Sequence, residues 1–338
     1  MQNSEISSEA AAILKVDEAS AGQRIDNFLT KTLKGVPKSH VYRILRSGEV
    51  RVNKGRVDAS YKLAMDDLVR VPPIRIAKSN TDLTVLEWQK SQQAQQASQF
   101  EGAIIFEDDA LLVIDKPAGF AVHGGSGISR GVIEQLRLER PKAKFLELVH
   151  RLDRETSGVL MLAKKRTALV TLHEMIRNNQ TDKRYLVMVA GEWTELRKNV
   201  QLNLQKYVLP SGERRVNVVT DLSKAPASEV QMSETNFVLK QRFIGYTLLE
   251  ARLVTGRTHQ LRVQLAHLGF AIAGDDKYGD FTLNKHLQKQ GLKRMFLHSA
   301  ETKLRHPVSG DKLQLIAPLP ANLQQFMNNL TVLEVQKV

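Results

Sequence analysis

The densest cluster of reactive side chains in the sequence runs from His150 to Gly158, HRLDRETSG. Its carboxylate Asp153 has an arginine, Arg151, two residues before it and another, Arg154, directly after it. Nearby guanidinium groups favour an ionised carboxylate, so Asp153 would be charged at neutral pH and able to act as a nucleophile or a general base. A structural salt bridge at the start of a strand is the competing interpretation, and it is the commoner outcome for such residues alone.

Two later segments carry further candidate residues. Tyr185 lies in an alternating pattern over residues 183–190 that predicts a strand covered on both faces. It is either a core tyrosine with a satisfied hydroxyl or a flat surface on which an extruded base stacks. His259 and Arg262 are three residues apart near the start of a predicted helix, where the positive helix end favours a phosphate or carboxylate. A local capping network explains that pair equally well.

Several classes of chemistry are excluded by what the sequence lacks. It contains no cysteine, which excludes cysteine nucleophiles, disulfides, thiolate zinc sites and iron–sulfur clusters. It contains no G-x-S-x-G, Walker A or G-x-G-x-x-G motif, and HRLDRETSG departs from the kinase catalytic loop. His259 and His267 have no third ligand at metal-binding spacing. We therefore expect no metal site, and we do not expect ATP or NAD as a cofactor.

Alternating and apolar patterns predict the elements that position these residues. Short apolar runs at 111–114 and 159–162 predict buried strands, and the first leads into a Lys116–Gly119 turn. Residues 248–254 predict another strand. After a turn at 255–257, Thr258 is expected to cap a helix that ends at Gly269.

The positive charge is concentrated near the N-terminus. The formal net charge is +13, and residues 20–76 hold 12 basic against five acidic residues. Such an excess makes polyanions the natural partners. The spacing predicts a helix over 25–33, a second helix capped by Ser39 and ended by Gly48, and a small sheet around an Asn53-Lys54-Gly55 turn. The predicted phosphate-binding cations crowd at this junction: Arg43, Arg46, Arg51 and Lys54. A solvated basic face is the alternative.

Residues 77–100 form a polar, glutamine-rich stretch that we interpret as an interdomain linker. The N-terminal residues lack the apolar run of a signal peptide, and no uncharged stretch approaches the length of a membrane-spanning helix. We expect a cytoplasmic protein.

The residues 23–29 (QRIDNFL) and 39–54 (SHVYRILRSGEVRVNK) resemble the S4-like RNA-binding domain. Four further motifs in order resemble the RluA-type pseudouridine synthases: DKPAG at 115–119, HRLDRETSG at 150–158, KRY at 183–185 and TGRTHQLR at 255–262. The resemblance implies an α+β chain, with an S4-like domain at 20–76 and a pseudouridine synthase domain at 101–330. The latter would be a mostly antiparallel mixed sheet with flanking helices and an RNA cleft.

The same resemblance implies a reaction and roles for the residues. Specific uridines in large-subunit (23S) ribosomal RNA would be isomerised to pseudouridine without a cofactor, in free RNA or in a pre-ribosomal particle, by a monomer. Asp153 would be the catalytic carboxylate, as nucleophile or base. Tyr185 would stack on the flipped base and Arg262 would pair with Asp153. The implied RNA contacts are Arg151, Arg154, Lys183 and His259.

One position departs from the family pattern, because Gln264 stands where the family often has histidine. We expect this change to alter a substrate contact at most. Two other functions stay open: a non-catalytic ribosome-assembly factor that uses the basic module, and a nucleoside or glycoside hydrolase. The hydrolase would need a second carboxylate, for which Asp108 and Glu155 are candidates.

Overall fold

The structure is a computed structural model that describes residues 10–33, 35–74, 100–124, 131–226 and 228–333. The chain divides into two compact units, residues 1–99 and 100–338. The predicted linker lies outside the described residues except for Phe100, which is buried in the core of the second unit. No described helix combines the length and apolar character needed to cross a bilayer.

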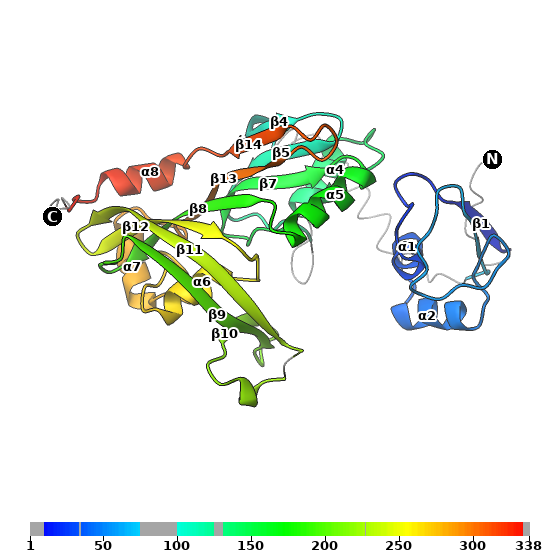
Figure 1. Cartoon of the computed structure of the whole chain (residues 1–338), viewed down its shortest axis with the longest axis horizontal. Coiled ribbons are helices and arrows are strands. Elements are labelled where there is room, and N and C mark those ends of the chain that lie inside the picture. The colour runs from blue at the N-terminus through cyan, green and yellow to red at the C-terminus, as the bar shows by residue number, and fades with distance from the viewer. Residues whose placement is uncertain (1–9, 34, 75–99, 125–130, 227, 334–338) are drawn as a thin grey trace. The chain divides into compact units, whose positions relative to one another are not determined.

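The first unit is the predicted arrangement of two helices and a small sheet (Figure 1). Helices α1 (Ile25–Thr32) and α2 (Lys38–Arg46) pack on strands β1 (Ala12–Lys15), β3 (Leu68–Val71) and β2 (Arg51–Val52), which lie in that order. The apolar stripe that predicted α1 is buried, and so are the apolar residues of α2. The sheet takes in residues ahead of position 20, because β1 pairs with β3.

The predicted cap of α2 is wrong. Ser39 lies inside the first turn, and Pro37 stands at the N-cap with the extended backbone that its ring favours. Gly48 does adopt the left-handed conformation expected after the helix, with φ of 72°. Asn53 and Lys54 also have positive φ, as the predicted tight turn requires.

The second unit is built on an 11-stranded sheet in the described residues. Its order is β10-β9-β11-β12-β8-β13-β7-β5-β4, with β14 beside β13 and β6 beside β7. Every pairing is antiparallel except that of β13 with β7. The prediction of an α+β chain with a mostly antiparallel mixed sheet is therefore confirmed. The strands are β4 (Ile104–Glu107), β5 (Leu111–Lys116), β6 (Glu147–Leu148), β7 (Ser157–Ala163), β8 (Asp182–Ala190), β9 (Arg197–Val208), β10 (Arg214–Val218), β11 (Val230–Phe243), β12 (Tyr246–Leu253), β13 (Leu297–Arg305) and β14 (Lys312–Ile316).

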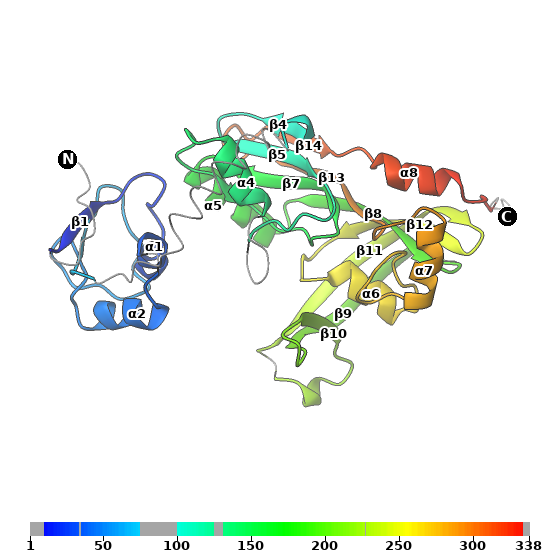
Figure 2. The ribbon, with the colours of Figure 1, turned by 180° about the vertical axis from the view of Figure 1, so that it is seen from behind.

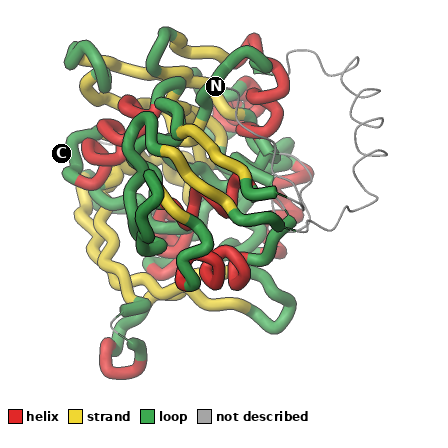
Figure 3. The backbone as a smooth tube through the Cα atoms, turned by 90° about the vertical axis from the view of Figure 1, so that its right-hand side faces the viewer, coloured by secondary structure: helices red, strands yellow, loops and turns green. Residues whose placement is uncertain are grey.

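Helices cover both faces of this sheet. They are α4 (Val132–Glu139), α5 (Arg166–Arg177), α6 (Gln260–His267), α7 (Phe281–Lys289) and α8 (Ala321–Asn328). Alternate residues of β5 and β7 face α4 on one side and α5 on the other, which explains their continuous apolar runs. Strands β9, β10 and β11 project from the rest of the sheet as an arm (Figure 2), which ends at the short turn η2 (Leu222–Lys224; Figure 3).

Gly158 allows β7 and β13 to approach each other. Its φ is 109°, and a Cβ atom there would lie 2.1 Å from the carbonyl oxygen of Ser299 on β13. Only glycine fits this position without moving a strand. This contact fixes the segment that follows the Asp153 loop.

Candidate active site

A cleft of about 800 Å³ opens where four segments of the second unit meet. They are the 148–156 loop that precedes β7, the C-terminal end of α5 with Asn179 just after it, the start of β8, and the 253–262 turn that leads into α6. Asp153 is the only carboxylate among the described residues that line it. The basic lining residues are Arg151, Arg177, Lys183, Arg257 and Arg262. A cleft with this balance of charge attracts a polyanion.

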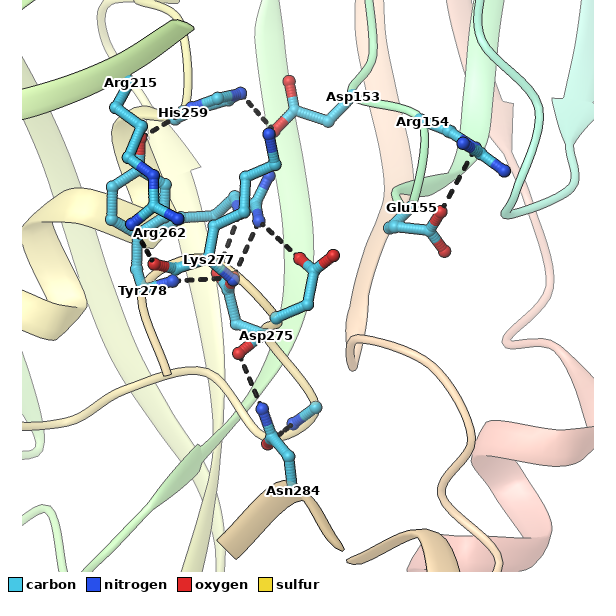
Figure 4. A network of polar contacts seen from close by, with 12 residues as sticks. Asp153, Arg154, Glu155, Arg215, His259, Arg262, Asp275, Lys277, Tyr278 and Asn284 are labelled. Atoms are coloured by element: carbon cyan, nitrogen blue, oxygen red, sulfur yellow. Dashed lines mark hydrogen bonds and ion pairs between the residues drawn. The ribbon is translucent and has the colours of Figure 1, made fainter. Parts of the chain in front are cut away.

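Arg262 holds Asp153 from the far wall of the cleft (Figure 4). Its Nη1 lies 3.3 Å from Oδ2 of Asp153, while its Nε and Nη2 each donate to Asp275 at 2.7 Å. Arg262 is 3% exposed and Asp275 is fully buried, whereas about a quarter of the Asp153 side chain is open to solvent. One guanidinium thus anchors in the protein through Asp275 and presents its remaining edge to Asp153.

The pKa values of the buried pair follow from this geometry. Burial alone would raise the pKa of Asp275, but its hydrogen bonds with Arg262 and with the amides of Lys277 and Tyr278 outweigh that and hold it below the usual value. Burial would lower the pKa of Arg262, and its carboxylate partners raise it instead. Both groups are charged at neutral pH.

The loop that carries Asp275 was missed by the sequence reasoning. Asn284 on α7 ties this loop down, because its amide donates to the Asp275 carbonyl at 2.7 Å and accepts from the Gly274 amide at 3.0 Å. Gly274 has φ of 80°, and a Cβ there would lie 2.3 Å from the Arg294 carbonyl oxygen. The string AGDDKYGD at 273–280, two acids and a tyrosine between glycines, was the available signal.

His259 approaches the same oxygen of Asp153 as Arg262 does, with its Nε2 3.9 Å from Oδ2. Its Nδ1 is 2.8 Å from the hydroxyl of Tyr278, which also accepts from the amide of Val216 at 3.0 Å. That hydroxyl therefore has its proton available for Nδ1, which leaves the Nε2 proton facing Asp153. Burial lowers the pKa of His259 and raises that of Tyr278 to about 12, so both side chains are neutral at pH 7.

The predicted start of α6 is wrong by one residue. The helix begins at Gln260, and His259 is its N-cap, in a left-handed conformation with φ of 52°. Thr258 is exposed, and the turn is closed by the Gln260 side chain, whose Oε1 accepts from the Arg257 amide and the Thr255 hydroxyl. This left-handed backbone conformation directs the His259 side chain toward the cleft.

Tyr185 lines the cleft from β8 and is 7% exposed. Its hydroxyl is hydrogen-bonded to Ser299, and burial raises its pKa to about 12. The phenol is therefore protonated at neutral pH. Tyr185 is a core residue, as one interpretation of the sequence holds, and it also forms part of the cleft wall, which the base-stacking interpretation requires.

Lys116, which the sequence reasoning assigned to a turn, anchors the Asp153 loop from below. It is fully buried, and Nζ donates to the carbonyl oxygens of Pro117 (2.8 Å), Phe120 (2.9 Å) and Arg154 (3.1 Å). Burial lowers its pKa to about 7. The Gly119 amide also donates to the Arg154 carbonyl, so the turn after β5 fixes the backbone next to Asp153.

Comparison with known proteins identifies this arrangement. The family model for RNA pseudouridylate synthase matches residues 110–267, and the model for the S4 domain matches residues 23–69. Over 329 residues the chain is 46% identical to ribosomal large subunit pseudouridine synthase C of Haemophilus influenzae, covering 97% of this chain and 98% of that protein. The chain belongs to the RNA pseudouridylate synthase family.

Other pseudouridine synthases agree in sequence and fold. The enzyme of the same name from Escherichia coli K12 is 48% identical over 320 residues, which covers 94% of this chain and 96% of the relative. The solved structure of human RNA pseudouridylate synthase domain containing 4 has a TM-score of 0.56 and 25% identity, covering 71% of this chain and 97% of that one. The predicted S4 and pseudouridine synthase resemblances are confirmed.

The cleft of this pseudouridine synthase contains most of the expected site residues. Asp153, Tyr185, Arg262, Arg151, Lys183 and His259 all line it. Arg154 does not, because its Nε donates to the Gly119 carbonyl at 3.0 Å and lies 3.5 Å from Glu155, on the side away from Arg262 (Figure 4). Within the described residues the arginine paired with Asp153 is Arg262, as the resemblance implies, and neither Arg151 nor Arg154 forms an ion pair with it.

The four cations predicted in the first unit have different surroundings. Arg43 pairs with Glu49 at 3.3 Å, and Arg46 donates to the Tyr42 carbonyl. Arg51 and Lys54 line a basic pocket of about 560 Å³ together with Arg56 and Arg70. The sequence reasoning left Arg70 out of this cluster, since it lies on β3 rather than at the turn.

Gln264 corrects a further expectation. It is fully buried on α6, where Oε1 accepts from the Thr235 hydroxyl at 2.7 Å and Nε2 donates to the Ser233 hydroxyl at 3.0 Å. Both partners lie on β11. Gln264 therefore joins α6 to the sheet and is not among the residues that line the cleft.

Replacing Lys116 with methionine should loosen the Asp153 loop. Lys116→Met keeps the length of the side chain and removes the ammonium that donates to three carbonyl oxygens, which costs about 2 kcal/mol of unfolding free energy. We expect a lower thermal midpoint and slower turnover. The exposed Lys142→Met variant is the control. Equal midpoints for the two variants in a thermal melt would contradict the anchoring role.

Proposed function

We propose that this pseudouridine synthase isomerises specific uridines in large-subunit (23S) ribosomal RNA, with Asp153 as its catalytic carboxylate. The observation that carries the proposal is that the sole carboxylate in the described lining of a basic cleft is held by a buried arginine. The names of the relatives, ribosomal large subunit pseudouridine synthase C, support the choice of RNA.

The cleft suits a flipped nucleotide. Extruding a uridine from folded RNA costs a few kcal/mol, and stacking on an aromatic side chain such as Tyr185 can return about 1–3 kcal/mol. Arg262 orients the Asp153 oxygens, either for attack on the ribose carbon or for removal of a proton from the sugar. The bond between the sugar and the base nitrogen then breaks, the base turns over, and a carbon of the base bonds to the sugar. That carbon loses its proton to solvent and the freed nitrogen gains one, so the overall change is an isomerisation.

The two alternatives gain less support. A hydrolase with paired carboxylates would require a second acid in the cleft, but Asp108 pairs with His306 and Glu155 with Arg154, and neither lines it. A non-catalytic assembly factor predicts normal growth when Asp153 is changed and defective ribosome assembly when Arg43 and Arg46 are changed together.

The proposal is tested by mapping pseudouridines in 23S ribosomal RNA from a strain without this protein. A small number of sites should lose the modification, and the wild-type gene should restore them while a gene carrying Asp153→Asn should not. Unchanged maps, or restoration by the Asp153 variant, would refute the proposed function.

Deleting residues 1–76 should weaken RNA binding and reduce its dependence on salt. The first unit holds the basic pocket around Arg51 and Lys54, and each cation that contacts a phosphate adds about 0.7–0.9 to the salt slope. Titrations of ribosomal RNA at several KCl concentrations measure both quantities. An unchanged slope would show that residues 100–338 do the electrostatic work.

A further inference from the structure

A second groove lies beside the active-site cleft, at the start of β8. It has a volume of about 550 Å³ and is lined by the segment 179–182, by Arg252 on β12, and by residues of the β13–β14 hairpin. Its charged lining residues are Arg252, Lys303, Arg305, Lys312 and Asp182. Four cations against one carboxylate make its potential strongly positive.

Strand register places these cations in a row. Arg252 lies opposite Arg184 of β8, Lys303 pairs with Asp182 of β8, and Arg305 lies opposite Lys312. Because Arg184 lies opposite Glu301, the row runs diagonally over β12, β8, β13 and β14, and at the usual strand spacing it extends about 14 Å across the strands. A row of this length matches a chain of phosphates better than a single small anion.

Not all of these charges are neutralised by the protein. Arg252 donates to Asp182 at 2.8 Å, and Lys303 lies 3.2 Å from Glu301. Within the described residues, Arg305 donates only to the Gly310 carbonyl, and no ion pair is found for Arg305 or Lys312. Both side chains are exposed. They are the two cations of the groove best able to bind an external phosphate.

Thr181 adds an independent observation. It is 8% exposed and lines the groove, and its hydroxyl has no hydrogen-bond partner among the described residues. A buried hydroxyl without a partner costs free energy that an external acceptor such as a phosphate oxygen would offset.

The groove meets the active-site cleft at the start of β8. Asp182 and Lys183 point to opposite faces of this strand and line the groove and the cleft respectively, while Asn179, just before the strand, lines both of them. An RNA strand with one nucleotide near Asp153 could therefore pass Asn179, around the end of β8, into the basic row.

We propose that this groove binds the phosphate backbone of the RNA that flanks the target nucleotide, with Arg305, Lys312 and the Thr181 hydroxyl as contacts. The proposal rests on the proposed function of the cleft and extends the RNA path beyond it. The groove lies outside the cleft that holds Asp153, so we expect it to contribute to RNA affinity and not to the reaction itself.

The test compares R305Q/K312Q with K285Q/K289Q in the full chain. The second pair removes the same charge from exposed residues of α7. Binding of a large-subunit ribosomal RNA transcript is measured over a series of KCl concentrations, and turnover is measured at saturating RNA. The groove variant should lower the salt slope by about 1.4–1.8 and weaken binding about tenfold at low salt, with kcat unchanged.

A second variant guards against disturbance of the β13–β14 turn, to which Arg305 is bonded. Lys312→Gln alone should lower the slope by about 0.7–0.9. A wild-type slope in both groove variants, or an equal fall in the α7 control, would overturn the groove proposal while leaving the proposed function intact. Absence of turnover by the wild-type chain on ribosomal RNA would instead refute the proposed function.

Discussion

Asp153→Asn should reduce turnover on ribosomal RNA by roughly 10²–10⁴-fold, whether the carboxylate acts as nucleophile or as base. The amide has nearly the same shape but carries no charge for Arg262 to orient and no lone pair basic enough to react. Binding of the RNA should change little, because the cations of the cleft are untouched. Tritium release from uracil-labelled RNA measures turnover, and a filter or fluorescence titration measures affinity.

Glu155→Gln is the matched control for this experiment. It removes a carboxylate two residues away that pairs with Arg154 and does not line the cleft. We expect near wild-type turnover. Undiminished activity of Asp153→Asn, or an equal loss in Glu155→Gln, would refute the assignment of the reacting oxygen to residue 153.

Asp275→Asn should destabilise the second unit by about 3–5 kcal/mol. The substitution removes the buried negative charge that pairs with the guanidinium of Arg262, which stays buried. Asp153 and Asp276 are the remaining carboxylates within reach of Arg262, at 3.3 Å each. Turnover should fall as well, since Arg262 is free to move toward them. Chemical denaturation gives the free energy, and the labelled-RNA assay gives the activity.

Asp276→Asn provides the comparison on the same loop. The side chain of Asp276 is 70% exposed, so its ion pair is screened by solvent and its loss should cost less than about 1 kcal/mol. Similar denaturation midpoints for the two variants would show that the buried pair contributes no more than a surface contact, contrary to the prediction.

The same pair predicts a dependence of stability on pH. The pKa of Asp275 is lowered in the folded chain, so its contribution is complete above the ordinary aspartate value of about 3.9 and is lost as pH falls through the folded value. The difference in unfolding free energy between wild type and Asp275→Asn should therefore shrink on acidification. A difference that is constant from neutral pH to pH 2 would contradict this.

Local patterns in the sequence predict much of the fold. The apolar runs at 111–114 and 159–162 gave buried strands because both faces of β5 and β7 are covered by helices. The apolar stripe of α1 predicted which face of that helix is buried, and Gly48 predicted the left-handed backbone after α2. Both are local properties of the chain. The caps were less predictable. Pro37 and the left-handed His259 replaced the expected Ser39 and Thr258. The ring of Pro37 favours the extended backbone at the first position, and the Tyr278 hydroxyl contacts His259 at the second.

The partners of the candidate site could not be predicted from spacing. Arg262 lies 109 residues after Asp153 in the chain, and Lys116 reaches the Arg154 carbonyl across 38 residues. Only the closing of the sheet brings such groups together. Asp275 is 13 residues from Arg262, but its role depends on a glycine-bounded loop packed against the Arg294 backbone, which leaves no periodic signal.

The hydroxyl of Tyr278 is shared by the β10 amide of Val216 and the ring of His259. β10 pairs with β9 in the projecting arm, and His259 faces Asp153. If β10 moves relative to α6, the hydroxyl of Tyr278 cannot keep both hydrogen bonds, to Val216 and to His259, at their present lengths. The projecting arm is thus linked to the surroundings of Asp153 through the hydroxyl oxygen of Tyr278, so we expect a movement of β10 to change the hydrogen bond that holds His259 beside Asp153.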